Sequence, residues 1–309
     1  MPPPEPSPAA AEPAIAARGL TKYYGEHAGA IDVDLEVRRG EVVGFLGPNG
    51  AGKSTTIKML LDFLEPSAGS AQVLGFDCQA QSLDVRRRVG FLSPDMGYYE
   101  GLTARALLEW VGRFRREDCS ARIAGLAERL GLDLDRRVAD LSTGNRQKVG
   151  LIQAFMHDPD VFILDEPTTG LDPLLRVEFR DMVREAAHAG RAVFLSSHVI
   201  DEVERSCDRV VIIKDARVVA HESVADLTGR SMREVSVRFS QPPDAALFST
   251  LDGVTDVVVD GDHLHLRLSG SPDALLKVVA RHQVVDFISS PVDLDEAFLH
   301  FYRDEAVDG

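Results

Sequence analysis

Residues 47–54 are the segment of the chain with the clearest chemistry. They read Gly47, Pro48, Asn49, Gly50, Ala51, Gly52, Lys53 and Ser54, which matches the pattern G-x-x-x-x-G-K-[ST]. In this pattern a glycine-rich turn directs backbone N–H groups at phosphate oxygens. We expect Lys53 to reach the β- and γ-phosphates and the hydroxyl of Ser54 to ligate Mg²⁺. The alternative is a glycine loop that matches by chance.

Two acidic residues stand at the end of an apolar run. Asp165 and Glu166 directly follow the apolar residues 161–164, which are typical of a buried parallel strand. Ligands of open α/β sheets bind outside the carboxyl ends of the strands. We therefore expect Asp165 to hold Mg²⁺ and Glu166 to orient or deprotonate an attacking water. The alternative is an acidic strand end that only caps the next loop.

A histidine ends a second apolar run. Residues 191–195 are predicted to form a strand, and Ser196, Ser197 and His198 follow it directly. Of the nine histidines in the chain, His198 alone has this setting. It is expected at the same ligand-binding edge of the sheet as Asp165 and Glu166.

The phosphate segment needs a strand before it and a helix after it. Residues 41–46 are predicted to form a buried strand, and residues 55–64 a helix with one apolar face. The segment then lies at a helix N-terminus, a position that favours anions. Ser142 is predicted to cap a second helix, whose N-terminus can also face an anion, although a plain cap is the simpler interpretation.

Composition limits the class of protein. The 309 residues carry a net charge of -15, which argues against a nucleic-acid binder. The sequence contains no run of 18 apolar residues that would span a membrane and no pattern of a secretory signal. Cys78, Cys119 and Cys207 are far apart, so they predict neither a disulfide framework nor a metal site. A cytoplasmic protein is the simplest interpretation.

The pattern along the chain predicts a tail and two domains. Residues 1–14 are rich in Pro and Ala and are expected to be a disordered tail. Alternating strands and helices follow over residues 15–229, and residues 102–130 have a helical pattern. Beyond residue 230 the order is strand, helix, two strands joined at 260–262, helix, strand and a last helix over 294–302. This order predicts a small α+β unit.

Three segments allow both a functional and a structural interpretation. Tyr24, beside Gly25, can stack on a nucleobase or simply pack in a turn ahead of the strand predicted within 16–37. The loop 93–101, with Tyr98 and Tyr99, can bind a partner protein or pack on its own domain. His263 and His265 share one strand face, where a polar outer surface explains them better than a metal site.

The order of these motifs resembles the ATP-binding subunits of ABC transporters. The segment 141–145 (Leu-Ser-Thr-Gly-Asn) resembles the signature of that family, and Ser142 follows Lys53 by 89 residues. Asp165 follows Ser142 by 23 residues and precedes His198 by 33. The resemblance covers residues 15–229 and implies an α/β phosphate-loop ATPase core with an antiparallel β subdomain and a helical subdomain over about 95–155. Residues 230–309 resemble, more weakly, the C-terminal unit of drug-resistance exporters.

The resemblance implies a role for each site residue. Glu166, His198 and Lys53 correspond to catalytic residues, with His198 at the γ-phosphate, and Tyr24 to the residue that stacks on adenine. Ser54, Asp165 and Asp95 correspond to the Mg²⁺ site. The remaining nucleotide contacts correspond to Gly47, Pro48, Asn49, Gly50, Ala51, Gly52, Thr55, Ser142, Gly144 and Asp172.

The resemblance also implies partners. Ser142 and Gly144 would complete the site of a second copy, Asp172 would link the two sites, and the homodimer would hold two ATP molecules with Mg²⁺. Integral membrane permease subunits would hold the chain at the inner face of the cell membrane, with Tyr98 and Tyr99 in the docking surface. A soluble ABC-type ATPase of DNA repair or translation is the alternative.

The sequence departs from the family pattern at two places. The family has Gln or Glu in the loop after the strand 89–92, whereas this chain has Ser93, Pro94 and Asp95. Asp95 is the expected substitute, with Pro94 as the other candidate for the position. In the signature, Thr143 and Asn145 replace Gly and Gln. We expect these changes to slow turnover without abolishing it.

Overall fold

The computed structural model of the chain describes residues 12–94, 97, 99, 101–114, 118–226 and 233–291. The chain folds as two compact units, unit 1 (Met1–His221) and unit 2 (Glu222–Gly309).

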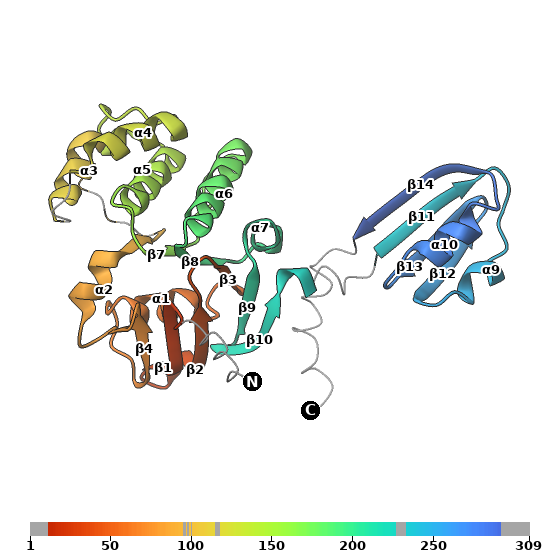
Figure 1. The fold of residues 1–309 in the computed structure, drawn as a ribbon, viewed down its shortest axis with the longest axis horizontal. Coiled ribbons are helices and arrows are strands. Elements are labelled where there is room, and N and C mark those ends of the chain that lie inside the picture. The colour runs from red at the N-terminus through yellow and green to blue at the C-terminus, as the bar shows by residue number, and fades with distance from the viewer. Residues whose placement is uncertain are drawn as a thin grey trace, which may run out of the picture. The chain divides into compact units, whose positions relative to one another are not determined.

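A parallel sheet forms the centre of unit 1 (Figure 1). Its strand order is β10-β9-β3-β8-β7-β6, and β9, β3, β8, β7 and β6 pair in parallel. Strands β3, β7 and β8 are buried along their whole length, as the apolar runs predict. The bounds are β3 (Val42–Leu46), β6 (Val89–Leu92), β7 (Val161–Asp165), β8 (Ala192–Ser197), β9 (Arg209–Lys214) and β10 (Arg217–Ser223).

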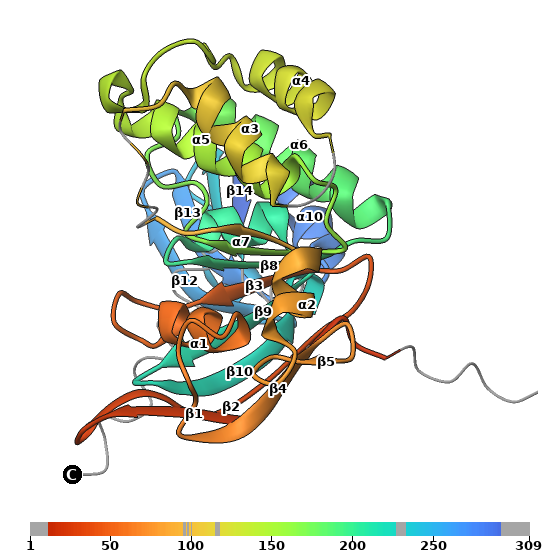
Figure 2. The ribbon, with the colours of Figure 1, turned by 90° about the vertical axis from the view of Figure 1, so that its left-hand side faces the viewer.

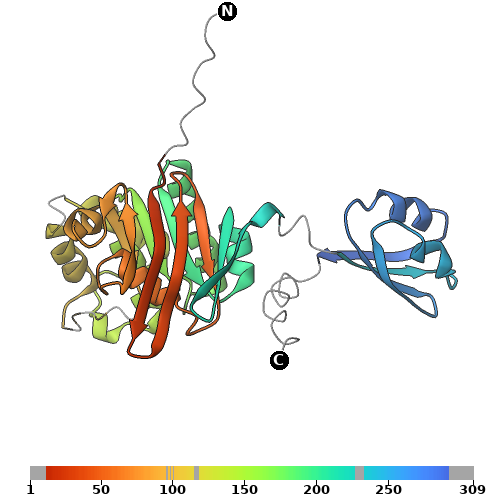
Figure 3. The same cartoon turned by 90° about the horizontal axis from the view of Figure 1, so that it is seen from below.

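An antiparallel sheet packs against the phosphate-loop helix. Its order is β2-β1-β4-β5, and β1 and β2 lie side by side (red in Figure 3). Helix α1 (Lys53–Leu60) lies between the two sheets (Figure 2), and its Ile57, Met59 and Leu60 are fully buried in a core shared by both. The strands are β1 (Ile15–Tyr24), β2 (His27–Val37), β4 (Ala68–Val73) and β5 (Phe76–Asp77).

Helices α2, α5, α6 and α7 contact strands of the parallel sheet, and α3, α4 and α5 pack on one another as a helical group (Figure 1). Thr103 caps α3 and Ser142 caps α5 through their side-chain oxygens. The helices are α2 (Ser82–Arg88), α3 (Ala104–Arg113), α4 (Ser120–Leu130), the 3-10 turn η1 (Val138–Asp140), α5 (Thr143–Phe155), α6 (Pro173–His188) and α7 (Ile200–Ser206).

Unit 2 is a four-stranded antiparallel sheet with order β12-β13-β11-β14. Its core lies on the face that the two short helices contact, with Val237, Phe239, Phe248 and Leu264 fully or almost fully buried. His263 and His265 lie on the other face, and their rings stack. The elements are β11 (Arg233–Phe239), α9 (Ala246–Ser249), β12 (Val254–Asp260), β13 (His263–Leu268), α10 (Asp273–Val279) and β14 (Val284–Pro291).

Several element boundaries differ from those predicted. The strand region 16–37 is a hairpin, because Gly25 (φ 63°) makes a tight turn that pairs Tyr24 with His27; Tyr24 therefore ends a strand instead of preceding one. Helix α1 ends at Leu60, four residues before the predicted end, and Asp62 just beyond it has a left-handed backbone (φ 55°). The helical stretch 102–130 is two helices. The helix predicted over 294–302 lies outside the described residues.

The predicted fold class is confirmed. A phosphate-loop α/β core carries an antiparallel β part and a helical part, and a small α+β unit follows it. Among the residues that the structure describes, we find no candidate for a membrane-spanning helix.

Candidate functional site

The phosphate loop connects β3 to α1, as predicted. Close packing requires glycine at two of its positions. A Cβ at Gly47 would lie 2.3 Å from the carbonyl oxygen of Ile213, and one at Gly52 (φ 108°) would lie 2.5 Å from that of Gly29. The N–H groups of the first helical turn, including those of Lys53 and Ser54, have no acceptor within the helix. The loop thus presents backbone donors where a phosphate can accept from them.

Lys53 lies inside this loop, with 5% of its side chain exposed. Its Nζ donates to the carbonyl oxygens of Gly47 (2.6 Å) and Pro48 (3.2 Å). The same ammonium lies 3.2 Å from Oε1 of Glu166. The buried cation is therefore held at the centre of the loop, where the sequence pattern predicts a phosphate contact.

Three parallel strands end together beside the loop. The register pairs Leu46 of β3 with Ser197 of β8, and Asp165 of β7 with Ser196 of β8. The residues that follow these strand ends, Gly47, His198 and Glu166, therefore lie at one edge of the sheet. The structure therefore brings the phosphate loop, Glu166 and His198 together, as expected for residues that follow neighbouring parallel strands.

Glu166 occupies the centre of this edge. Its Oε2 lies 2.8 Å from Nδ1 of His198. Its Oε1 is buried and forms an ion pair with Nζ of Lys53 at 3.2 Å. The backbone of Glu166 is left-handed (φ 48°), a strained conformation for a residue with a side chain, and such strain concentrates at functional sites. A carboxylate held between a lysine and a histidine fits a group that binds a water or a substrate proton.

Ser196 joins the two acids and was not singled out from the sequence. Its Oγ donates to Oδ1 of Asp165 (2.5 Å) and accepts from the backbone N–H of Glu166 (3.0 Å). Asp165 is buried (3% exposed), and this hydroxyl holds its carboxylate at the strand end. The signal in the sequence was its position in the polar triplet that ends in His198.

The magnesium site was predicted at Ser54, Asp165 and Asp95. Ser54 lies in the first turn of α1 and Asp165 at the end of β7, so a hydroxyl and a carboxylate, oxygen ligands that Mg²⁺ prefers, flank the loop. These two residues fit the ion. Asp95 lies outside the described residues.

Tyr24 is placed close to the loop by the hairpin turn. A Cβ at Gly29 would lie 2.6 Å from Cε2 of Tyr24 and 3.1 Å from Cγ2 of Thr55, so the ring and Thr55 lie against the same backbone. The ring is 48% exposed, and Nζ of Lys22 lies 5.9 Å from its centroid. An exposed aromatic face beside the phosphate loop is suited to stacking on a base.

The signature segment and Asp172 lie together at two helix starts. Oγ of Ser142 accepts from the N–H of Asn145 (3.4 Å) and so caps α5. Asp172 caps α6 by accepting from two backbone N–H groups at 3.0 Å each. A Cβ at Gly144 would lie 2.8 Å from the carbonyl oxygen of Gly170, so only glycine allows these segments to pack so closely.

A partly buried carboxylate that sequence reasoning missed lies next to the site. Oε2 of Glu202 accepts from Oγ1 of Thr168 (2.6 Å) and from Oγ of Ser197 (3.0 Å). Glu202 lies in α7, and nothing in its sequence pattern distinguishes it from a solvated helical acid.

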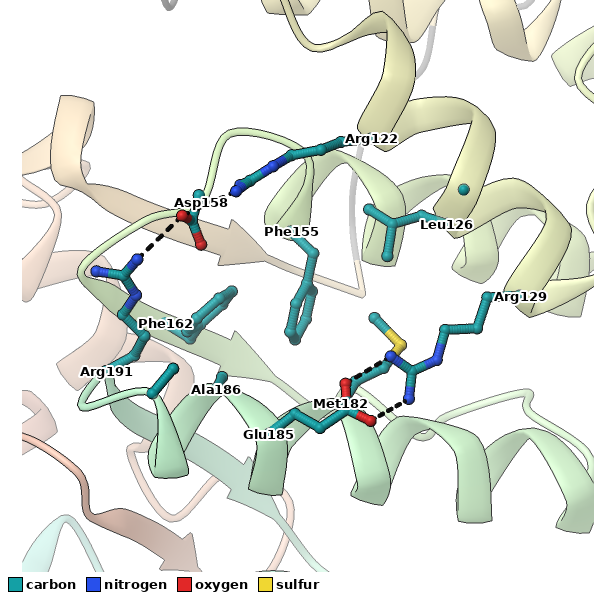
Figure 4. Close-up of a pocket in the computed structure, with 12 residues that line it drawn as sticks. Arg122, Leu126, Arg129, Phe155, Asp158, Phe162, Met182, Glu185, Ala186 and Arg191 are labelled. Carbon is teal, nitrogen blue, oxygen red and sulfur yellow. Dashed lines mark hydrogen bonds and ion pairs between the residues drawn. The ribbon is translucent and has the colours of Figure 1, made fainter.

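A cavity of about 490 Å³ lies between α4 and α6 (Figure 4). Its apolar lining includes Leu126, Phe155, Phe162 and Met182. Arg129 of α4 forms two hydrogen bonds with Glu185 of α6 (2.7 and 2.8 Å), and Arg122 lies 2.8 Å from Asp158. These ion pairs tie the helical group to the rest of unit 1.

The loop, the buried lysine and the paired acids define a phosphate-loop nucleoside triphosphatase. A family profile described as "ABC transporter" matches residues 31–169. The chain is 36% identical to the daunorubicin resistance ATP-binding protein DrrA3 of Streptomyces coeruleorubidus, over 96% of this chain and 98% of that protein. It is 40% identical to the ABC transporter ATP-binding protein NatA of Bacillus subtilis, over 63% of this chain and 82% of that protein.

A solved structure agrees with this assignment. It is described as the structure of the ATP binding subunit of an ABC transporter, is 31% identical, and superposes with a TM-score of 0.65 over 69% of this chain and 91% of that one. The chain belongs to the ABC transporter ATP-binding proteins, and it is an ATPase of that family.

Proposed function

We propose that the chain powers an ABC exporter by binding ATP between two copies of itself and hydrolysing it. One observation carries the catalytic part of this proposal: Glu166 lies between Lys53 and His198 at the phosphate loop. A carboxylate that contacts both a phosphate-binding cation and a histidine is placed to act on a water beside a terminal phosphate.

Different residues of the chain have different roles in phosphoryl transfer. The backbone N–H groups of the loop and the ammonium of Lys53 bind and orient the phosphates, and Tyr24 stacks on the adenine. Glu166 accepts the proton of the attacking water. His198 contacts the Glu166 carboxylate and the γ-phosphate and so positions one relative to the other. Ser54 and Asp165 would hold Mg²⁺, which would neutralise charge on the phosphates when bound.

The signature segment suits a site that a second copy completes. Ser142, Gly144 and Asp172 lie at the starts of α5 and α6, where helix N-termini favour an anion. In the proposed homodimer these residues of one copy close over the ATP of the other. ATP then stabilises the closed pair and hydrolysis releases it.

The membrane partner is proposed from an exposed aromatic cluster. Tyr99, Trp110 and Phe114 are 60%, 40% and 66% exposed, and their rings form edge-to-face contacts at 5.1 Å. Large exposed aromatics mark protein interfaces. We assign this cluster to the docking surface for integral membrane permease subunits, which would hold the chain at the inner face of the membrane. Tyr98, also predicted there, lies outside the described residues.

The exporter assignment follows the relatives. DrrA3 is named for daunorubicin resistance, and the match to it extends over both units of this chain. Drugs, lipids or similar small molecules are therefore the proposed cargo. A soluble ABC-type ATPase with a role in DNA repair or translation is less well supported, because the net charge of -15 disfavours nucleic acid.

The experiment that tests the catalytic proposal is ATP hydrolysis by the purified chain and by its Glu166→Gln variant. We expect the variant to retain nucleotide binding and to lose almost all hydrolysis. A variant that hydrolyses ATP at the wild-type rate would contradict the assignment of Glu166.

A further inference from the structure

We propose that Glu202 is a positioning residue that holds the loop 167–172 against the strand end carrying His198. It does not touch the reacting atoms; it acts through Thr168 and Ser197. This inference rests on the proposed roles of Glu166 and His198, and it adds a residue to which neither the motifs nor the family resemblance assigns a role.

The carboxylate of Glu202 joins two segments that each carry a catalytic residue. Thr168 lies two residues after Glu166, and Ser197 directly precedes His198. Both hydroxyls donate to the same oxygen, Oε2, at 2.6 and 3.0 Å. One carboxylate oxygen therefore fixes the position of both segments.

Arg176 closes a ring of contacts around the loop. Its Nη1 lies 3.5 Å from Oε1 of Glu202, and its Nε donates to the carbonyl oxygen of Leu171 (3.2 Å). The loop is therefore held near its start at Thr168 and near its end at Leu171, one residue before Asp172. The same ring can set the placement of Asp172 for the second site of the proposed dimer.

The chemistry of the cluster requires an acceptor at this position. A carboxylate only accepts hydrogen bonds, so it satisfies two hydroxyl donors at once. Thr168 is 8% exposed, Ser197 is 1% exposed, and the side chain of Glu202 is 13% exposed. Removing the acceptor leaves the Thr168 hydroxyl without its 2.6 Å partner and leaves Ser197 only the carbonyl oxygen of Val199 at 3.3 Å, so both segments then shift.

Such a shift reaches the catalytic pair directly. Glu166 and His198 are in contact at 2.8 Å, and each is one or two residues from a group that Glu202 holds. A displacement of about 1 Å at a reacting group can cost about 100-fold in rate. Lys53 and the phosphate loop belong to other segments, so ATP affinity depends much less on this cluster.

The test compares Glu202→Ala and Thr168→Val with Thr168→Ser, which restores the hydroxyl. The control is Asp201→Ala, which removes the neighbouring carboxylate of α7, one that pairs with Arg205 on the surface. For each variant we would measure kcat and KM for ATP, the Kd of a fluorescent ATP analogue (mant-ATP), and the melting temperature.

We expect Glu202→Ala and Thr168→Val to lower kcat about tenfold or more, with KM and Kd for nucleotide within about threefold of wild type. Thr168→Ser and Asp201→Ala should keep kcat within about twofold. If Glu202→Ala does not fold, the difference in kcat between Thr168→Val and Thr168→Ser tests the inference instead.

An unchanged kcat in Glu202→Ala and Thr168→Val would overturn the inference. This holds also if the variants bind nucleotide more weakly, with a higher KM and Kd. In either case an active wild type leaves the proposed function standing. A wild-type chain without ATPase activity would overturn both.

Discussion

Nδ1 of His198 lies 2.8 Å from Oε2 of Glu166, although the two residues are 32 positions apart in the sequence. They meet because β7 and β8 are parallel neighbours whose ends are level, with Asp165 paired to Ser196. The left-handed backbone of Glu166 and the hydroxyl of Ser196, which accepts from the Glu166 N–H, keep the glutamate at this edge.

This contact predicts that His198→Ala lowers kcat about 100-fold or more, because a positioned group in general acid–base catalysis contributes about 100- to 10,000-fold. ATP affinity should change little, because the phosphate loop and Tyr24 are untouched. Steady-state ATPase kinetics with a nucleotide-binding assay would measure both quantities. The matched control is His188→Ala, which removes an exposed histidine at the end of α6; its kcat should equal that of the wild type.

Tyr24 supplies a second prediction. Tyr24→Ala should weaken ATP binding by about 1–3 kcal/mol, the contribution of one aromatic–base stack, whereas Tyr24→Phe should keep it. Tyr23 is a suitable control, because it is adjacent and similarly exposed (45%). Isothermal titration with ATP and with triphosphate alone would separate the base contact from the phosphate contact. Equal losses in the alanine variants of Tyr23 and Tyr24 would count against stacking.

The aromatic cluster predicts that association with the permease can be weakened without changing basal ATP hydrolysis. Trp110→Ala should weaken association with the permease by about 2 kcal/mol or more, as for a buried aromatic anchor of an interface, while basal ATPase stays unchanged. Co-purification of the tagged chain with its membrane partner would measure the first effect. Val177, also exposed but located on α6, offers a control as Val177→Ala. Undiminished co-purification of the Trp110 variant would remove the cluster from the docking surface.

Arg129 predicts a stability effect that depends on pH. Its hydrogen bond holds the pKa of Glu185 below the ordinary value of 4.5. Glu185 therefore contributes stability above that pH and loses the contribution as the pH falls through its lowered pKa. Because Glu185 is 63% exposed, Arg129→Gln should cost only about 1 kcal/mol at pH 7, or about 2–4 °C in the melting temperature of unit 1.

Thermal melts of the wild type and of Arg129→Gln across pH 3 to 7 would check this prediction. The difference between the two proteins should shrink on acidification below about 4.5. A difference that stays constant over this range would show that Arg129 acts through packing and not through its ion pairs.

The positions of residues that belong to a local sequence pattern were predictable, because neighbouring residues in the chain determine the structure there. The phosphate loop was predicted from its glycines and Lys53, and the position of Asp165 from the apolar run before it. The roles given to the site residues remain predictions, but the structure places Glu166 in contact with both Lys53 and His198, as the strand order requires.

Residues that depend on tertiary contacts could not be predicted. Glu202 acquires its importance from Thr168 and Ser197, which other elements supply. The hairpin that brings Tyr24 to the loop depends on a turn at Gly25, which a continuous β pattern over 16–37 concealed. A helical pattern likewise could not show where α3 ends and α4 begins.

The most direct test of the central claim is size-exclusion chromatography of Glu166→Gln with and without ATP and Mg²⁺. Without hydrolysis, ATP should hold two copies together, so we predict a dimer with ATP and a monomer without it. Adding Ser142→Arg to the same variant should abolish the dimer, since the proposed interface cannot accommodate that side chain. A Glu166→Gln chain that binds ATP yet elutes only as a monomer would contradict the proposal that a second copy completes the site.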